Sequence, residues 1–264
     1  MGFLSIIRPL NCVITFFSVL CGAWIGKEIF FNNKILFAGI AGSLVCAYGN
    51  IINDIMDIEI DRINNPKRAL ASGRIKKNTA LSMGILFIII SLIISSFLGF
   101  KPLLLVVIAI LLLFFYSFYF KKTPVANFVV AIIAGLSFIL GGFITDNILS
   151  LIPAFFALLI HTPREIIKDI SDIEGDRKFG VVSLPIIYGE EKARQIAAIL
   201  LVILASASPI PYILGFLNIK YLLAVLIAAV PLIIVTIAKL HNARLAGNLL
   251  KLIMLVGLGA FIIG

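Results

Sequence analysis

The chain has 264 residues, 61% of them hydrophobic and 13% charged, and its formal net charge at pH 7 is +9. Soluble globular proteins carry about twice that charged fraction, so the composition excludes a soluble protein and indicates that lipid surrounds most of the chain. A basic chain could also bind nucleic acid, but here we expect the surplus of Lys and Arg at the cytoplasmic membrane face and no nucleic-acid partner.

Runs without charged residues mark the candidate membrane spans. Each has close to the ~20 residues that a helix needs to cross the hydrocarbon core, and lipid offers no hydrogen bonds to a backbone that is not helical. In chain order the runs are 9–26, 35–53, 78–100, 102–120, 123–145, 147–163, 195–219, 221–238 and 245–264, the last interrupted only by Lys251. The sequence therefore predicts an all-α integral membrane protein, a bundle of about nine transmembrane helices in one domain over residues 1–264.

Two connections between these runs are long and polar, at 54–77 and 164–194. If the N-terminus is cytoplasmic, both lie on the cytoplasmic side, which then holds seventeen of the 22 Lys and Arg residues against four on the other side. This asymmetry predicts a multi-pass protein of the cell membrane with its polar loops in the cytoplasm.

An acidic cluster lies at the end of the second run, and a matching one follows the sixth. The first contains Asn50, Asn53, Asp54, Asp57, Glu59 and Asp61, and the second contains Glu165, Lys168, Asp169, Asp172, Glu174 and Asp176. Counted from Asn50 and from Glu165, both place polar groups at offsets 0, 4, 7 and 11. On a helix these offsets fall within an arc of about 60°, so each cluster is expected to form one column of oxygen ligands. The match suggests an internal repeat that brings the two columns face to face.

Carboxylates stacked at helical spacing repel one another, and a divalent cation removes that cost. Mg²⁺ takes hard oxygen ligands and commonly bridges carboxylates to phosphate oxygens. The alternative is that both clusters are solvated loop faces, as charge runs usually are, and we expect this of Glu59 and Glu174. The predicted metal-binding and catalytic residues are Asp54, Asp57, Asp61, Asp169, Asp172 and Asp176.

The segments NDIMDIEID at 53–61 and DISDIEGD at 169–176 resemble the two Asp-rich signatures of the UbiA-type intramembrane prenyltransferases. The likeness extends to RPLN at 8–11, NPKRALASG at 65–73 and YSFYFKK at 116–122. It implies nine helices around a central cavity with a lateral opening to lipid, and Mg²⁺-dependent transfer of a prenyl group.

The resemblance also implies which residues meet the diphosphate of the prenyl donor: Asn50, Asn53, Arg68, Tyr116, Lys121, Lys122, Arg164 and Lys168. For each Lys or Arg the competing interpretation is a membrane-face anchor, and for Tyr116 it is the interfacial aromatic belt. We expect His161 and His241 to be structural.

Within the family, the RPLN start and the second Asp-rich segment are most similar to the archaeal branch that forms the second ether bond of membrane lipids. The donor would be geranylgeranyl diphosphate and the lipid-like acceptor geranylgeranylglyceryl phosphate, with no obligate protein partner inferred. Prenylation of an aromatic quinone precursor remains the alternative. A CDP-alcohol phosphotransferase is disfavoured because the first cluster lacks the DG and AR elements of that signature. A cation transporter is disfavoured because the acids lie at span ends.

Overall fold

The computed structural model describes residues 2–27 and 32–264, and within them every regular element is helical. The first half comprises α1 (Gly2–Ile7), α2 (Pro9–Trp24), α3 (Asn33–Met56), α4 (Ile58–Asn64), α5 (Lys77–Leu98), α6 (Phe100–Phe118), the 3-10 turn η1 (Phe120–Lys122) and α7 (Ala126–Thr145). The second half comprises η2 (Ile148–Ser150), α8 (Leu151–Lys178), α9 (Leu184–Tyr188), α10 (Glu190–Ala207), α11 (Ile210–Ile213), α12 (Ile219–Ala224), the π-helical η3 (Val225–Ala229), α13 (Val230–Ala238) and α14 (Ala243–Ile263). The all-α prediction is confirmed.

The predicted number of spans is slightly off. Among the described residues eight helical segments are long and apolar enough to cross a membrane, and the ninth apolar helix, α2, has 16 residues. At 1.5 Å per residue α2 is about 24 Å long, short of the ~30 Å hydrocarbon core. It begins at Pro9, where the uncharged run begins, and ends at Trp24, two residues before that run does. The left-handed backbone conformation of Arg8 (φ 51°) separates it from α1, so the two helices do not form one longer span.

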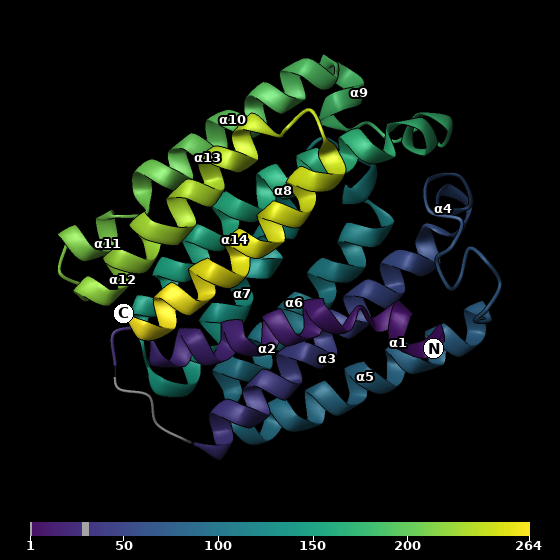
Figure 1. Ribbon diagram of the computed structural model, residues 1–264. Helices are drawn as coiled ribbons and strands as arrows, with labels where there is room; N and C mark the ends of the chain where they lie inside the picture. The colour runs from purple at the N-terminus through teal and green to yellow at the C-terminus, as the bar shows by residue number, and fades with distance from the viewer. Residues whose placement is uncertain (1, 28–31) are drawn as a thin grey trace.

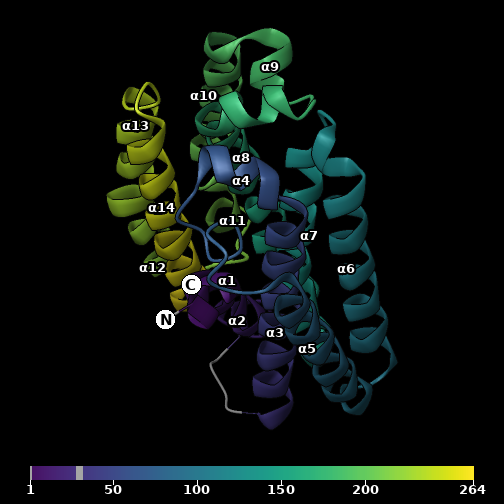
Figure 2. The same ribbon diagram turned by 90° about the vertical axis from the view of Figure 1, so that its right-hand side faces the viewer.

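The bundle is built around α2, α3, α7 and α8. Helix α7 packs on α2 and α8, α3 packs on α2 and α5, and α10 and α14 pack on α8. Figure 1 shows α3 and α5 on one side of the molecule and α10 and α13 on the other, and Figure 2 places α4 and α9 together at one end. In membranes small residues permit this close packing: a Cβ at Gly22 of α2 would overlap the backbone carbonyl of Phe138 on α7, and one at Gly141 would overlap that of Val19.

The two stretches expected to be polar loops, 54–77 and 164–194, are largely helical, which corrects that expectation. Helix α3 continues to Met56 and is followed by α4, and α8 runs without interruption from Leu151 to Lys178. A helix satisfies its own backbone hydrogen bonds and does not need apolar residues, so it can extend beyond the stretch that lipid covers. The irregular part of the first stretch is limited to Asp57 and residues 65–76.

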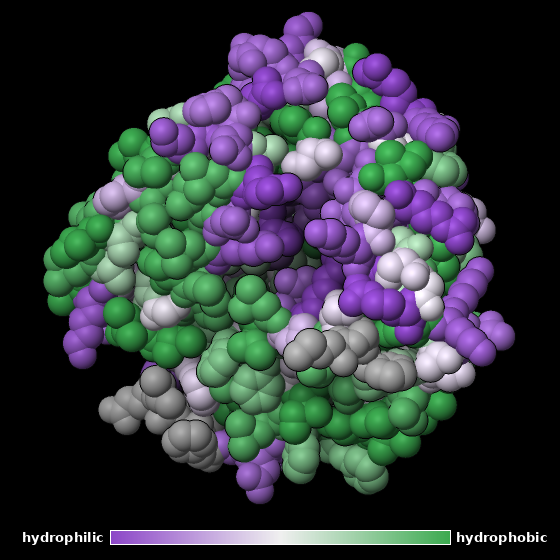
Figure 3. Space-filling model, turned by 45° about the vertical axis from the view of Figure 1, so that its right-hand side comes forward, coloured by the Kyte–Doolittle hydropathy of each residue, from purple (hydrophilic) through white to green (hydrophobic). Residues whose placement is uncertain are grey.

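The surface separates by polarity. Large hydrophobic side chains are exposed along α5, α6, α10 and α13, as expected where lipid is the solvent. Figure 3 shows hydrophilic side chains gathered around a hollow on one face, with hydrophobic surface beside and below it. The molecule is therefore a multi-pass membrane protein with one polar entrance on the face shown.

Candidate active site

A small cavity of about 30 Å³ lies between the first acidic cluster and α8. We call it the small cavity; its charged lining residues are Asp57, Asp61, Arg68, Lys121, Lys168, Asp169, Asp172 and Asp176. The two predicted acidic columns are thus brought together, with five of the six predicted aspartates on one cavity. The sixth, Asp54, is buried beside them at 4% exposure.

The first column does not lie on one continuous helix, in contrast to the expected geometry. Asp57 interrupts the helical backbone (φ −94°, ψ 3°) and separates α3 from α4. Asp54 therefore belongs to the end of α3 and Asp61 to α4. The spacing nevertheless predicts correctly that Asp57 and Asp61 line the same cavity. After the break at Asp57, α4 still packs on α8, and both side chains stay on the side that faces it.

Three cationic side chains hold the first column in place. Arg68 Nη1 lies 2.7 Å from Asp61 Oδ2 and 3.5 Å from Asp54 Oδ1. Arg8 also donates a hydrogen bond to Asp54 Oδ1. Lys121 pairs with Asp57 and donates to Asn53 Oδ1 at 2.8 Å. Buried carboxylates are tolerated where they are paired and hydrogen-bonded in this way.

The second column is borne by α8. Asn127 of α7 donates to Asp169 Oδ2 at 2.9 Å. Among the described residues no hydrogen bond or ion pair engages the carboxylates of Asp172 and Asp176, so both are available to a ligand in the small cavity.

The pKa shifts around the small cavity follow first from burial and then from the neighbouring charges. Burial raises the pKa of the Asp61 carboxyl, and the neighbouring Asp57 and Asp54 raise it further against the opposing effect of Arg68. Burial lowers the pKa of Lys121, an effect that Asp57 counteracts. For Arg68, burial lowers the pKa but the carboxylates of Asp61 and Asp54 outweigh it, so the net shift is upward.

The donor set fits Mg²⁺. Five carboxylates and three cationic side chains line the small cavity, which leaves an excess of two negative charges, and all the anionic donors are the hard oxygens that Mg²⁺ prefers. Among the described residues no three His, Cys, Asp or Glu side chains are arranged as a ready ligand set, because Lys121 and Arg68 draw Asp57 and Asp61 toward themselves. Asp172 and Asp176, which carry no such partner, would hold the ion together with Asp57 and Asp61.

Asn64 ties α4 to α8 and was not singled out from the sequence. Its side-chain amide donates to the carbonyl of Asp172 at 2.9 Å, and its Oδ1 accepts from Gly175 N at 2.9 Å. These two bonds fix the distance between the acidic columns. Gly175 permits them because a Cβ at that position would lie 2.7 Å from Asn64 Cγ.

Gly175→Ala should therefore loosen the site. The added methyl group displaces the Asn64 amide, and loss of two hydrogen bonds costs about 0.5–1.5 kcal/mol each. We expect a lower apparent Tm in detergent and a higher Mg²⁺ concentration for half-maximal activity. Gly247→Ala is the matched control, since a Cβ there meets no atom within 4 Å; equal behaviour of the two variants would contradict the assigned role of Asn64.

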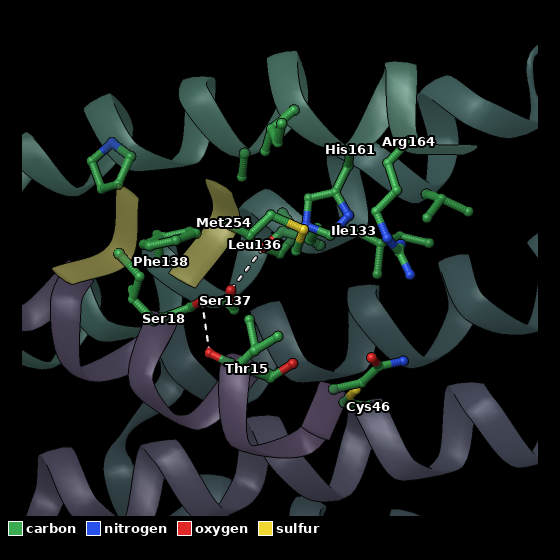
Figure 4. Close-up of a pocket in the computed structure, with 18 of the residues that line it drawn as sticks. Thr15, Ser18, Cys46, Ile133, Leu136, Ser137, Phe138, His161, Arg164 and Met254 are labelled. Carbon is green, nitrogen blue, oxygen red and sulfur yellow. Dashed lines mark hydrogen bonds between the residues drawn. The ribbon is translucent and has the colours of Figure 1, made fainter. Parts of the chain in front are cut away.

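A larger cavity of about 310 Å³ lies between the membrane-spanning helices of the bundle. Its lining is mostly apolar, and its polar end includes Arg8, Asn50, Asn53, Arg164, Glu165 and Lys251. We call it the large cavity; Figure 4 shows Ser18, Ser137, His161 and Arg164 around part of it. Tyr116 and Lys168 line both cavities, so the two meet at these side chains.

The predicted diphosphate-binding residues divide between these cavities. Arg68 and Lys121 lie on the small cavity, whereas Asn50, Asn53 and Arg164 lie on the large one. Arg164 pairs with Glu165 at 2.8 Å and Lys168 with the same carboxylate at 3.2 Å. Asn50 donates to the carbonyl of Ile7 at 3.0 Å and so braces the α1–α2 turn. Lys122 is among the lining residues of neither cavity.

Arg8, Asn127 and Glu165 were not proposed as site residues from the sequence. Asn127 has a signal that could have found it, because it is a polar residue inside an otherwise apolar span, and such residues are functional candidates by default. Glu165 sits at offset zero of the second column, but its partners Arg164 and Lys168 compensate its charge. Arg8 is 46 residues away from the Asp54 that it contacts, and only the tertiary structure reveals the pair.

Comparison with known proteins gives one family. The model of the UbiA prenyltransferase family matches residues 15–255. A protein of Methanocaldococcus jannaschii named digeranylgeranylglyceryl phosphate synthase is 38% identical over 271 residues, which cover 99% of this chain and 95% of that protein. A solved structure described as giving insights into digeranylgeranylglyceryl phosphate synthase in membranes is 39% identical, with a TM-score of 0.77 and coverage of 100% of this chain and 97% of that one.

A more distant structure has the same fold. A UbiA homolog from Archaeoglobus fulgidus, solved bound to GPP and Mg²⁺, superposes with a TM-score of 0.75 at 18% identity and covers 99% of both chains.

Proposed function

The chain belongs to the UbiA prenyltransferase family, and we propose that it transfers a geranylgeranyl group from geranylgeranyl diphosphate to the hydroxyl of geranylgeranylglyceryl phosphate. The product carries the second ether bond of an archaeal membrane lipid. The named relative at 38% identity supports this choice of donor and acceptor. The single observation in the structure that carries it is the junction of the acidic small cavity with the larger, mostly apolar one at Tyr116 and Lys168.

The two cavities suit the two chemically different parts of the substrates, the charged head and the apolar tails. The diphosphate head belongs in the small cavity, where Arg68, Lys121 and Lys168 present cationic donors. Prenyl tails belong in the large cavity, whose apolar lining accepts hydrocarbon at little cost. The reacting carbon then lies near the junction, within reach of an acceptor hydroxyl that enters from the large cavity.

The residues of this chain carry most of the chemistry. The allylic C–O bond breaks, and its electron pair leaves with the diphosphate, whose growing charge Arg68, Lys121 and Lys168 stabilise. A bound Mg²⁺ supplies further stabilisation of that charge as a Lewis acid. The acceptor oxygen forms the new C–O bond, and its proton passes to a carboxylate of the acidic columns. The apolar walls exclude water that would otherwise capture the allylic cation.

We propose that the active site lies on the cytoplasmic side. Helix α4, the segment 65–76, η1 and the C-terminal part of α8 all contribute residues to the small cavity. These segments hold the Lys and Arg surplus that marks cytoplasmic loops.

A reconstituted reaction tests the proposal. Detergent-purified protein should form a diether phosphate and release diphosphate from geranylgeranyl diphosphate, geranylgeranylglyceryl phosphate and Mg²⁺, with activity abolished by EDTA and restored by added Mg²⁺. Product with 4-hydroxybenzoate or a naphthoate, and none with the glyceryl phosphate, would favour quinone-precursor prenylation instead. Ion flux in liposomes without diphosphate release would favour a transporter.

A further inference from the structure

Lys251 is a cation inside an apolar helix that neither the fold nor the transfer reaction explains. It lies on α14 (Ala243–Ile263), a candidate membrane span, and it lines the large cavity. Among the described residues no ion pair or hydrogen bond engages its ammonium group. A charged side chain at membrane depth costs free energy unless it faces a cavity or a partner, so Lys251 points to an anion that the cavity receives.

The cations around Lys251 strengthen this argument. Arg164 and Arg8 line the same cavity, and their positive charges repel that of Lys251 across it. Within residues 2–27 and 32–264 each of these arginines has one carboxylate partner, Glu165 for Arg164 and Asp54 for Arg8. A guanidinium carries five N–H donors, so both retain donors for a further acceptor.

His161 supplies an independent observation. Its Nδ1 atom is buried and has no hydrogen-bond partner among the described residues. Figure 4 shows the His161 ring and the Arg164 side chain projecting from α8 into the large cavity. Leaving such a buried polar atom unpaired costs about 1–3 kcal/mol, a cost that a polar group bound in the cavity would remove. The described residues thus offer His161 Nδ1 no hydrogen bond that would support the expected, purely structural role.

The two cavities differ in the sign of their charge. The large cavity is lined by four cationic residues, Arg8, Arg164, Lys168 and Lys251, and by one acidic residue, Glu165, an excess of three positive charges. The small cavity has an excess of two negative charges, with Lys168 common to both. A metal ion belongs where carboxylates exceed cations, whereas a free phosphate belongs where cations exceed carboxylates.

We propose that Lys251, Arg164 and His161 bind the phosphomonoester of the acceptor, and that this subsite selects a phosphorylated acceptor over a neutral one. The inference rests on the proposed function, since it assigns the site of that acceptor. Arg164 thereby serves the acceptor phosphate, whereas the sequence had assigned it to the donor diphosphate.

Lys251→Met tests the subsite, because Met keeps the apolar stem and removes the charge. The KM for geranylgeranylglyceryl phosphate should rise about 10- to 100-fold, the value of one or two charge-assisted hydrogen bonds, while the KM for geranylgeranyl diphosphate stays the same. Wild-type protein should prefer the phosphorylated acceptor to geranylgeranylglycerol, and the variant should lose that preference. Lys251→Arg should restore most of it.

Lys239→Met is the matched control, an exposed lysine that lines neither cavity, and it should behave as wild type. A rise in the donor KM would overturn the inference, because the cations would then serve the donor diphosphate. Unchanged acceptor selectivity in Lys251→Met would overturn it as well.

A binding measurement separates this inference from the proposed function. Geranylgeranylglyceryl phosphate alone, without donor or metal, should raise the apparent Tm of wild type but not that of Lys251→Met. That shift without turnover would count against the proposed reaction and leave the anion subsite standing. Turnover by wild type with equal Tm shifts in both proteins would count against the subsite alone.

Discussion

Asp172→Asn should lower the turnover number for prenyl transfer by about 10²–10³-fold or more, the range seen when a single stabiliser of transition-state charge is lost. The change replaces a carboxylate that lines the small cavity and has no partner among the described residues. Asn is isosteric and removes the negative charge that a divalent cation requires. Because no ion pair is broken, the apparent Tm should stay close to that of wild type.

Glu174→Gln is the control for that experiment. Glu174 lies two residues further along α8, is exposed, and is not on the lining of either cavity. Its loss should leave turnover unchanged. If Asp172→Asn retained near-normal rates at saturating Mg²⁺, the acidic cavity would not be the reaction centre.

Arg68→Met should impair both stability and turnover. Arg68 is shared by Asp61 at 2.7 Å and Asp54 at 3.5 Å, and both carboxylates are 4% exposed. Removing one partner from a buried ion pair costs about 3–5 kcal/mol, since the remaining charge stays desolvated. The variant also loses a cation of the small cavity, so we expect a lower apparent Tm together with a lower turnover number.

A second substitution separates these two effects. Arg68→Met combined with Asp61→Asn removes the orphaned charge and should recover part of the Tm without recovering activity. Arg74→Met is the matched control. Within the described part of the chain this exposed arginine donates hydrogen bonds only to Ser72 and to the carbonyl of Lys67, and surface changes of this kind stay within about 0.5 kcal/mol. Equal Tm values for Arg68→Met and Arg74→Met would show that the ion pairs contribute nothing measurable.

The membrane spans and the acidic columns show what run length and residue spacing can predict from the sequence. The hydrophobic runs locate the spans because lipid contact requires about 20 uncharged residues of helix. The spacing of Asp169, Asp172 and Asp176 correctly places three carboxylates on one cavity, since α8 is continuous there. Where the helix breaks at Asp57, the same spacing gives the right cavity but the wrong local geometry.

The sequence could not predict which charged side chains pair or which cavity each of them lines. The family resemblance implied that Arg68, Lys121 and Arg164 lie near phosphate, but not that Arg164 lines the large cavity while Arg68 and Lys121 line the small one. Nor could the sequence show that Asn64 sets the distance between α4 and α8. Each of these facts depends on which helices become neighbours.

The sequence by itself determined the helical membrane fold and the acidic character of the site, because these follow from local composition and from spacing along one helix. Its motifs also indicated the family, by their resemblance to known signatures. The tertiary structure alone decided the division into an acidic and a cationic cavity, the junction at Tyr116 and Lys168, and the position of Lys251 on the large cavity. The physical reason is that electrostatic balance depends on distances in space. Residues such as Arg8 and Asp54, 46 positions apart, acquire their interaction only when packing brings α2 and α3 together.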